Sequence, residues 1–328
     1  MTFVLLSTEA FGGYLGLELA EHPAEWLDKA YKFNSARAAF AHFVTQLNIG
    51  KVWLPRYICN TMIDFLSSQG TEITFYDIND EFEITTEIGL DPHSLLLYVN
   101  YFGLCSRQAH KVIERYGAAN VVIDNSQAFF NKPFESLATI YSPRKYFGVP
   151  DGGLLYINGG NIQLPEQRDA SSETRMSHLI SRLSNSPEAA YQQYLEAEKA
   201  ISKLQIKRMS RLTERLLRSI DYERAKIIRL GNARHLNKYL REYNQLNFTI
   251  NEDSVPLCYP FLPKVETSTR EELIRKRVFL PCYWTEALCR VEEGGFEWAL
   301  INRGLFLPCD QRYNETDMEK LISLLEIK

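Results

Sequence analysis

Residues 140–153 read Ile140-Tyr141-Ser142-Pro143-Arg144-Lys145-Tyr146-Phe147-Gly148-Val149-Pro150-Asp151-Gly152-Gly153. Lys145 follows the end of a predicted strand, Ala138–Tyr141, and a turn-rich segment then leads into the apolar run Leu154–Ile157. A lysine amine held beside an internal pocket is what Schiff-base chemistry requires. The double glycine lets the backbone pass close to a bulky group. The stretch therefore favours a lysine-centred site between two strands, with a surface lysine as the ordinary alternative.

Strand-like and helix-like patterns alternate around this stretch, from about residue 51 to residue 158. Helix-like segments such as Tyr57–Ser67 and Arg107–Tyr116 lie between several of the apolar runs. Most runs are continuous and aliphatic or β-branched, which is typical of strands covered on both faces. The alternation predicts an α/β fold with a largely parallel sheet. The predicted strands are Val52–Leu54, Ile73–Tyr76, Leu95–Asn100, Val121–Asp124, Ala138–Tyr141 and Leu154–Ile157.

Two further segments carry candidate binding residues. Ser35 is a good helix N-cap, and the small side chains in Ser35–Ala39 leave the first backbone amides open, which suits a phosphate. Asp124 ends a buried strand, with Gln127 three residues later. Because ligands of α/β sheets bind at the carboxyl ends of strands, Asp124 could hold a cationic ring nitrogen. Alone, the Ser35 segment is a weak signal, because most capped helices bind nothing, and Asp124 is equally consistent with a simple cap.

Several classes of protein are disfavoured by what the sequence lacks. It has no G-x-G-x-x-G fingerprint, Walker A loop, H-E-x-x-H or G-x-S-x-G motif, and its six histidines are scattered. The net charge of −4 gives no reason to expect nucleic acid or a membrane as a partner. The six cysteines show no C-x-x-C spacing, and Met1–Leu6 does not read as a secretory signal. We therefore expect reduced thiols in a cytoplasmic protein that binds no metal.

The chain is 328 residues long, which suggests two domains. Residues 172–230 read as one or two long helices, and mixed structure follows them. The eight basic residues of segment 207–229 are interpreted as a solvated helix face rather than a nucleic-acid surface. We expect a large domain over residues 1–230, including these helices, and a smaller C-terminal domain over residues 231–328.

Taken together, the three segments resemble the DegT/DnrJ/EryC1/StrS family of sugar aminotransferases. In that family a small-residue helix start binds the phosphate of pyridoxal 5′-phosphate (PLP), a D-x-x-Q segment binds its ring, and a lysine followed by Gly-Gly binds it covalently. Here Ser35–Ala39, Asp124 with Gln127, and Lys145 with Gly152-Gly153 match in order and spacing. The resemblance implies a three-layer fold-type-I PLP transferase with a mostly parallel sheet and a smaller C-terminal α+β domain.

The resemblance also implies roles for individual residues. Lys145 would be the catalytic lysine and Asp124 the partner of the pyridine nitrogen. The backbone amides of Ala36 and Arg37, behind the cap Ser35, would bind the phosphate. In the segment Trp53–Cys59, Tyr57 is the nearest candidate for the aromatic ring that packs on the cofactor. The family's sites lie at a dimer interface, so a homodimer is implied.

The sequence departs from the family pattern at several positions. Ala36 stands where a glycine is usual, Ile123 where an acid is usual, and Asn100 where a histidine is usual. The serine expected five residues before the lysine is Ile140, so Ser142 becomes the candidate side-chain donor to the phosphate. These departures affect the phosphate contacts and the substrate more than the roles of the lysine and the aspartate.

The activity implied is transfer of an amino group from an amino acid, typically glutamate, to a ketosugar that is attached to a nucleotide, for surface polysaccharide or antibiotic sugar synthesis. Three alternatives stay open: a PLP-dependent sugar dehydratase, in which a histidine usually replaces the lysine; a non-catalytic relative acting as a sensor or scaffold; and a nicotinamide enzyme. The loops Gly12–Tyr14 and Asp310–Tyr313 are candidates for substrate specificity.

Overall fold

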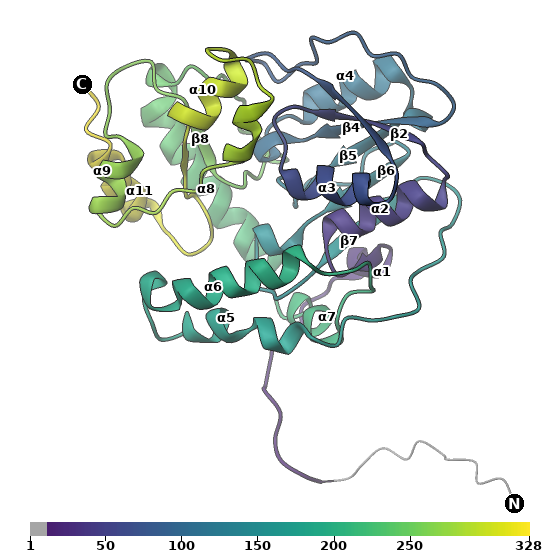
Figure 1. Cartoon of the computed structure of the whole chain (residues 1–328). Coiled ribbons are helices and arrows are strands. Elements are labelled where there is room, and N and C mark those ends of the chain that lie inside the picture. Colours follow the sequence, from purple (N-terminus) through teal and green to yellow (C-terminus); the bar gives the residue numbers. More distant parts are fainter. Residues whose placement is uncertain (1–11) are drawn as a thin grey trace, which may run out of the picture.

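The computed structural model describes residues 12–328, so the Met1–Leu6 segment lies outside the described residues. Its centre is a seven-stranded sheet in the order β1-β7-β6-β5-β4-β2-β3 (Figure 1). The five strands β2 to β6 run parallel, whereas β7 and β1 are antiparallel to their neighbours. The strands are β1 Tyr31–Phe33, β2 Lys51–Pro55, β3 Glu72–Tyr76, β4 Ser94–Val99, β5 Val121–Asp124, β6 Ala138–Tyr141 and β7 Gly153–Ile157. The expected mostly parallel sheet is confirmed.

Helices cover both faces of this sheet. The chain moves outward in one direction from β2 through α3 to β3, and in the other direction from β4 through α4 to β5. Because parallel crossovers are right-handed, α3 and α4 must lie on opposite faces. Figure 1 shows α2 and α3 together in front of the sheet, and α2 packs against α3 and β7. The three-layer α/β architecture is therefore confirmed.

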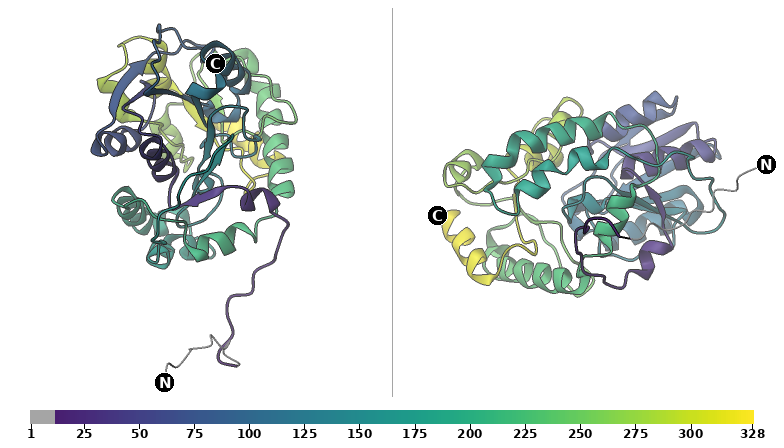
Figure 2. Two further views of the ribbon diagram at one scale, coloured as in Figure 1. Left: turned by 90° about the vertical axis from the view of Figure 1, so that its right-hand side faces the viewer. Right: turned by 90° about the horizontal axis from the view of Figure 1, so that it is seen from below.

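The helices of the large part differ in detail from the expected ones. They are α1 Glu25–Asp28, α2 Ala36–Gln46, α3 Asn60–Ser68, α4 Ser106–Tyr116, α5 Ser177–Ser181, α6 Pro187–Ser202, α7 Arg211–Leu217 and α8 Tyr222–Leu240. Segment 172–230 thus holds three helices and the start of a fourth, of which α6 and α8 are long. Helices α5 and α6 pack side by side (Figures 1 and 2). The boundary expected after residue 230 falls inside α8.

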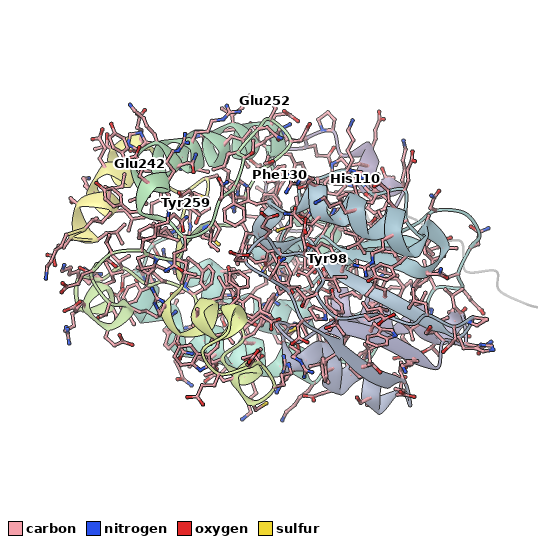
Figure 3. All side chains as sticks on the ribbon, turned by 90° about the horizontal axis from the view of Figure 1, so that it is seen from above. Tyr98, His110, Phe130, Glu242, Glu252 and Tyr259 are labelled. Carbon is pink, nitrogen blue, oxygen red and sulfur yellow. The ribbon has the colours of Figure 1, made fainter. Side chains whose placement is uncertain are left out.

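The C-terminal part has a small core of its own. A two-stranded antiparallel sheet pairs β8 Tyr259–Phe261 with β9 Leu305–Leu307. Around it lie α8, α9 Arg270–Arg275, α10 Phe296–Arg303 and α11 Glu315–Leu324. Buried side chains of α8, β8, β9 and α11 form one apolar cluster, and Figure 3 shows Tyr259 there, apart from Tyr98 of the large sheet. The division into two domains stays a prediction. No helix among residues 12–328 is long and apolar enough to cross a membrane.

A buried acid joins α10 to the large sheet. Glu297 is 5% exposed, its Oε1 has no hydrogen-bond partner among residues 12–328, and the nearby backbone amides of Tyr57 and Ile78 favour its charged form. Burial, together with the nearby charge of Asp77, raises the pKa of Glu297 to about 7. The folded chain therefore holds a proton here that the unfolded chain releases near pH 4.5.

This titration predicts how stability depends on pH. Because the folded-state pKa of Glu297 is the higher one, the stability that this group contributes is complete below pH 4.5 and is lost as pH rises through 7. The loss amounts to about 3 kcal/mol at most. Glu297→Gln should therefore gain free energy of unfolding relative to wild type at pH 8 and not at pH 5, as measured by urea titrations. An identical pH dependence in both proteins would contradict this assignment.

Candidate active site

The residues singled out in the sequence meet at one edge of the large sheet. Asp124 is the last residue of β5, and Lys145 follows β6 by one short turn. Tyr57 follows β2, and Asn100 follows β4. Because these four strands are parallel, their carboxyl ends share one edge, where α/β sheets bind their ligands. The topology alone thus gathers four segments that are far apart in the sequence.

Asp124 is a buried carboxylate close to the amine of Lys145. It is 6% exposed, and its Oδ1 accepts a hydrogen bond from the backbone amide of Ser126 at 2.7 Å. Burial raises the pKa of Asp124, and the positive charge of Lys145 is the strongest influence opposing that rise. A protonated ring nitrogen next to this carboxylate would stabilise its charged form in the same way.

Lys145 ends a 3₁₀ turn, Pro143–Lys145, and its side chain is exposed. Its Nζ lies 5.8 Å from the ring centroid of Trp284. Trp284 has a left-handed backbone, with φ 59° and ψ 51°, which is strained for a bulky residue. Trp284, from the C-terminal part of the chain, thus supplies an aromatic ring beside Lys145. No sequence pattern around Trp284 predicted this position.

Tyr57 lies in the same aromatic cluster. Its ring stacks on Tyr101 at a centroid distance of 5.7 Å and meets the edge of Trp284 at 4.7 Å. The side chain is fully buried, and its hydroxyl has no hydrogen-bond partner within the described part of the chain. Contact of Tyr57 with a cofactor ring stays a prediction, and Trp284 is a second candidate for that contact.

The side-chain amide of Gln127 has a buried donor, Nε2, without a hydrogen-bond partner among the described residues. The side chain is fully buried, and its Oε1 accepts a hydrogen bond from the amide of Phe102 at 2.8 Å. Its Nε2 is buried and makes no hydrogen bond to any described residue. A buried donor without a partner costs about 1–3 kcal/mol, so an acceptor on a bound molecule would be stabilised here.

The start of α2 is held against the double glycine. The amide of Gly152 donates to the carbonyl of Asn34 at 3.0 Å, and a Cβ on Gly153 would lie 2.1 Å from the carbonyl carbon of Ser35. Only glycine fits at position 153, because the backbone of the next segment occupies the space of a side chain. This close approach brings the segment that follows Lys145 to the predicted phosphate-binding helix.

The first turn of α2 has a free backbone amide. Ser35 caps the helix by accepting from the amide of Ala38 at 3.1 Å, and the first full helical bond runs from Ala39 to the Ser35 carbonyl. The amide of Arg37 makes no hydrogen bond within residues 12–328, whereas the parallel bridge between Ser35 and Gly152 directs the amide of Ala36 toward the Gly152 carbonyl. The helix start therefore offers the N–H group of Arg37 and a positive dipole end.

Two guanidinium groups lie near this helix start. Burial lowers the pKa of Arg37, and the charge of Arg144 lowers it further, so the two cations are close to one another. Arg37 donates to the carbonyl of Ile201, and Arg144 is paired with Glu198, both on α6. The Nε atoms of both arginines are buried and unpartnered among the described residues. An anion between them would relieve both the repulsion and the missing hydrogen bonds.

Ser142 stands next to this group. It is half-buried, and its carbonyl accepts a hydrogen bond from the amide of Lys145 at 3.2 Å. Its hydroxyl does not cap the short turn that follows, so it is free to donate elsewhere. Of the sequence-predicted residues, the structure thus brings Asp124 next to Lys145 and the α2 start next to the double glycine.

Known structures share this architecture. A DegT DnrJ EryC1 StrS aminotransferase from Brucella abortus matches with a TM-score of 0.59 and 17% identity over 92% of this chain and 86% of its own. A Streptococcus pneumoniae protein described as a sugar aminotransferase, in its PMP form, matches with a TM-score of 0.64 and 12% identity over 90% and 86%. The E. coli GDP-4-keto-6-deoxy-D-mannose-3-dehydratase with bound hydrated PLP matches with a TM-score of 0.58 and 13% identity over 90% and 87%.

These likenesses establish the fold. The chain has the fold of PLP-dependent sugar aminotransferases and of a related sugar dehydratase, as the resemblance in the sequence predicted. No protein-family model matches the sequence, and no curated protein matches it either. The activity therefore has to be argued from the site.

Proposed function

We propose that the protein is a PLP-dependent aminotransferase that moves an amino group from an amino acid, with glutamate the first choice, to a nucleotide-linked ketosugar. The observation that carries the proposal is the proximity of Lys145 to the buried carboxylate of Asp124 at the carboxyl edge of the sheet. A cofactor that needs both an amine for covalent attachment and an anion for its ring nitrogen fits this pair.

The residues of the site fit PLP in three places. Asp124 would hold the protonated ring nitrogen, and the free Nε2 of Gln127 would donate to a ring substituent. The start of α2, where the amide of Arg37 is free, would bind the phosphate. When bound, PLP supplies an electron sink for carbanion chemistry. The three roles correspond to features of the protein itself: a buried carboxylate, an unpartnered amide donor and a helix start with a free N–H group.

The protein's own part in the reaction is proton transfer and charge control. Once the amine of Lys145 is free, its Nζ can take a proton from the substrate carbon and return one, as general base and then general acid. Asp124 would keep the ring nitrogen of bound PLP protonated, because a buried carboxylate and an adjacent cation stabilise each other's charge. The ring of Trp284 lies beside the Nζ of Lys145.

Two other functions fit the same fold. A PLP-dependent sugar dehydratase is represented among the structural neighbours, but Lys145 opposes it, since in dehydratases of this type a histidine usually replaces the lysine. A non-catalytic relative would lack turnover altogether. The discriminating experiment is an absorbance spectrum of the protein with PLP, followed by addition of glutamate and then of a nucleotide-linked ketosugar. Because a dehydratase neighbour also carries a PLP-glutamate adduct, conversion of the cofactor to its amine form supports the aminotransferase only when an aminosugar is then formed. A cofactor band unchanged by glutamate and other amino acids contradicts it.

The surface supports the proposal of a homodimer. Helices α5 and α6 expose several large apolar side chains, and so does the N-terminal segment that extends away from the body (Figure 1). Clustered exposed apolar groups mark association surfaces. The helix pair also carries Glu198 and Ile201, the partners of Arg144 and Arg37. A second copy on this face would therefore lie close to the proposed phosphate site. The exposed side chains are Tyr14, Leu15, Leu17, Ile180, Leu183, Tyr191, Tyr194 and Leu195.

If the phosphate binds beside Ser142 and Arg144, substitution of either residue should weaken the affinity of the protein for PLP. Ser142→Ala and Arg144→Met should each weaken PLP binding by about 1–3 kcal/mol, the scale of a lost bond to a charged group. Affinity is measured by absorbance titration of cofactor-free protein. Arg115→Met, which removes an exposed arginine of α4, is the control and should bind normally. Unchanged affinity in both test variants would place the phosphate elsewhere.

A further inference from the structure

Arg229 of α8 is a buried cation whose donors bind carbonyl and amide oxygens and no carboxylate. It is 2% exposed, and its charge helps to lower the pKa of Asp310, which is itself paired with Arg312. Its Nη1 donates to the carbonyls of Pro256 and Leu257, each at 3.2 Å, and its Nε donates to Gln311 Oε1 at 2.7 Å. Burying a guanidinium without a carboxylate is costly unless its donors are satisfied, and here carbonyl and amide oxygens satisfy them.

The remaining donor of Arg229 acts on the residue that follows Lys145. Its Nη2 donates to the carbonyl of Tyr146 at 3.3 Å, and Gln311 Nε2 donates to the same oxygen at 3.0 Å. The guanidinium also lies 4.5 Å from the centroid of the Tyr146 ring. The C-terminal part of the chain thus contacts Tyr146 twice: two donors bind its carbonyl, and the guanidinium of Arg229 makes a cation–π contact with its ring.

The other end of Tyr146 is tied to the segment that carries Asp124. Its hydroxyl donates to the carbonyl of Gln127 at 2.5 Å. Tyr146 is therefore fixed at its carbonyl, its ring and its hydroxyl, between the C-terminal part and the loop after β5. Rotation of this residue would move Lys145 and the Gln127 loop relative to each other.

The turn that carries Lys145 needs such support. It is a single 3₁₀ turn, closed by the bonds from Lys145 to Ser142 and from Tyr146 to Pro143. Short 3₁₀ turns have weak hydrogen-bond geometry and little stability of their own. The direction of the Lys145 side chain is therefore set by the contacts of Tyr146.

We propose that Arg229 and Gln311 are positioning residues that aim the amine of Lys145 at the carbon with which it reacts. The inference rests on the proposed function, because it concerns the covalent capture of PLP. In that step the amine of Lys145 and the aldehyde of PLP form a C=N bond and release one water molecule. A correctly aimed amine reacts faster, whereas a misplaced one reacts slowly even in a folded protein.

Gln311→Glu is the sharpest test variant. Gln311 is half-buried and lines a cavity of about 350 Å³, so the substitution should be tolerated. Glutamate keeps an acceptor for Arg229 Nε but cannot donate to the carbonyl of Tyr146. Arg229→Lys keeps the charge and loses the fork of donors. Arg234→Met, on the same helix with an exposed side chain, is the matched control.

The rate of capture is followed by stopped-flow absorbance after cofactor-free protein is mixed with PLP. The attached residue is identified by borohydride reduction and peptide mapping. We expect Gln311→Glu and Arg229→Lys to slow capture at Lys145 by about ten- to hundredfold. The thermal midpoint of cofactor-free Gln311→Glu should stay within a few degrees of wild type, and Arg234→Met should behave as wild type.

Two failures can be told apart. If wild type captures PLP at Lys145 and Gln311→Glu does so at the same rate, the positioning role is wrong while the proposed function stands. If wild-type protein does not capture PLP at Lys145, the proposed function fails and the positioning role fails with it. A Gln311→Glu protein that captures slowly only because it is partly unfolded, as judged by circular dichroism at the assay temperature, also counts against the role.

Discussion

Lys145→Ala should abolish covalent binding of PLP and lower transamination by at least about 10⁴-fold, the upper range for a positioned acid–base group. The alanine can neither attach the cofactor nor carry a proton at Nζ. Among residues 12–328, Lys145 is the lysine whose charge acts on the buried Asp124, so no other described lysine is placed to substitute for it. The measurement combines steady-state turnover with glutamate and the absorbance spectrum of the protein with PLP.

Borohydride reduction and peptide mapping make this prediction specific. In wild type the label should fall on Lys145, and in Lys145→Ala it should disappear. Lys132→Ala removes an exposed lysine of the same region and should keep both label and turnover. Labelling of a different lysine in the wild-type protein would refute the assignment of Lys145.

Asp124→Asn should lower kcat by several orders of magnitude while the protein still binds some PLP. A carboxylate stabilises the protonated ring nitrogen, and a neutral amide of the same shape does not, so the ring loses its capacity to accept electrons. Half-reaction kinetics with glutamate measure the loss directly. Asp64→Asn, an exposed position on α3, should be unaffected. Turnover near the wild-type rate in Asp124→Asn would mean that another group holds the ring nitrogen.

The same substitution should not destabilise the cofactor-free protein. Burial raises the pKa of Asp124, so as pH rises through that value the ionised carboxylate reduces the stability of the folded chain. Asparagine removes this charge. At pH 8 the thermal midpoint of cofactor-free Asp124→Asn should therefore equal or exceed that of wild type, whereas the increase on adding PLP should be smaller. A large drop in the midpoint would indicate that Asp124 has a mainly structural role.

Much of this site could be inferred from local sequence. The aliphatic runs around Val121–Asp124 and Ala138–Tyr141 predict strands because continuous burial leaves a pattern that needs no knowledge of the rest of the chain. Three candidate residues then lie at the ends of predicted elements: Ser35 begins a helix, Asp124 ends a strand and Lys145 follows a strand. Parallel pairing collects them at one edge, so the fold class and the proximity of Asp124 to Lys145 follow from the sequence pattern, whereas the roles of the two residues stay predictions.

Tertiary structure decided what surrounds that pair. Three contacts join segments that are remote in the chain. Trp284 lies beside Lys145, Arg37 lies close to Arg144, and Arg229 donates a hydrogen bond to the carbonyl of Tyr146. The continuation of α8 past the expected domain boundary was likewise decided by the tertiary structure. Local periodicity reports which face of an element is buried, but it does not report which distant element buries it. Which distant element covers a buried face depends on the entropy cost of closing the intervening loops and on the packing of the whole core. Both are determined only when the complete chain is folded.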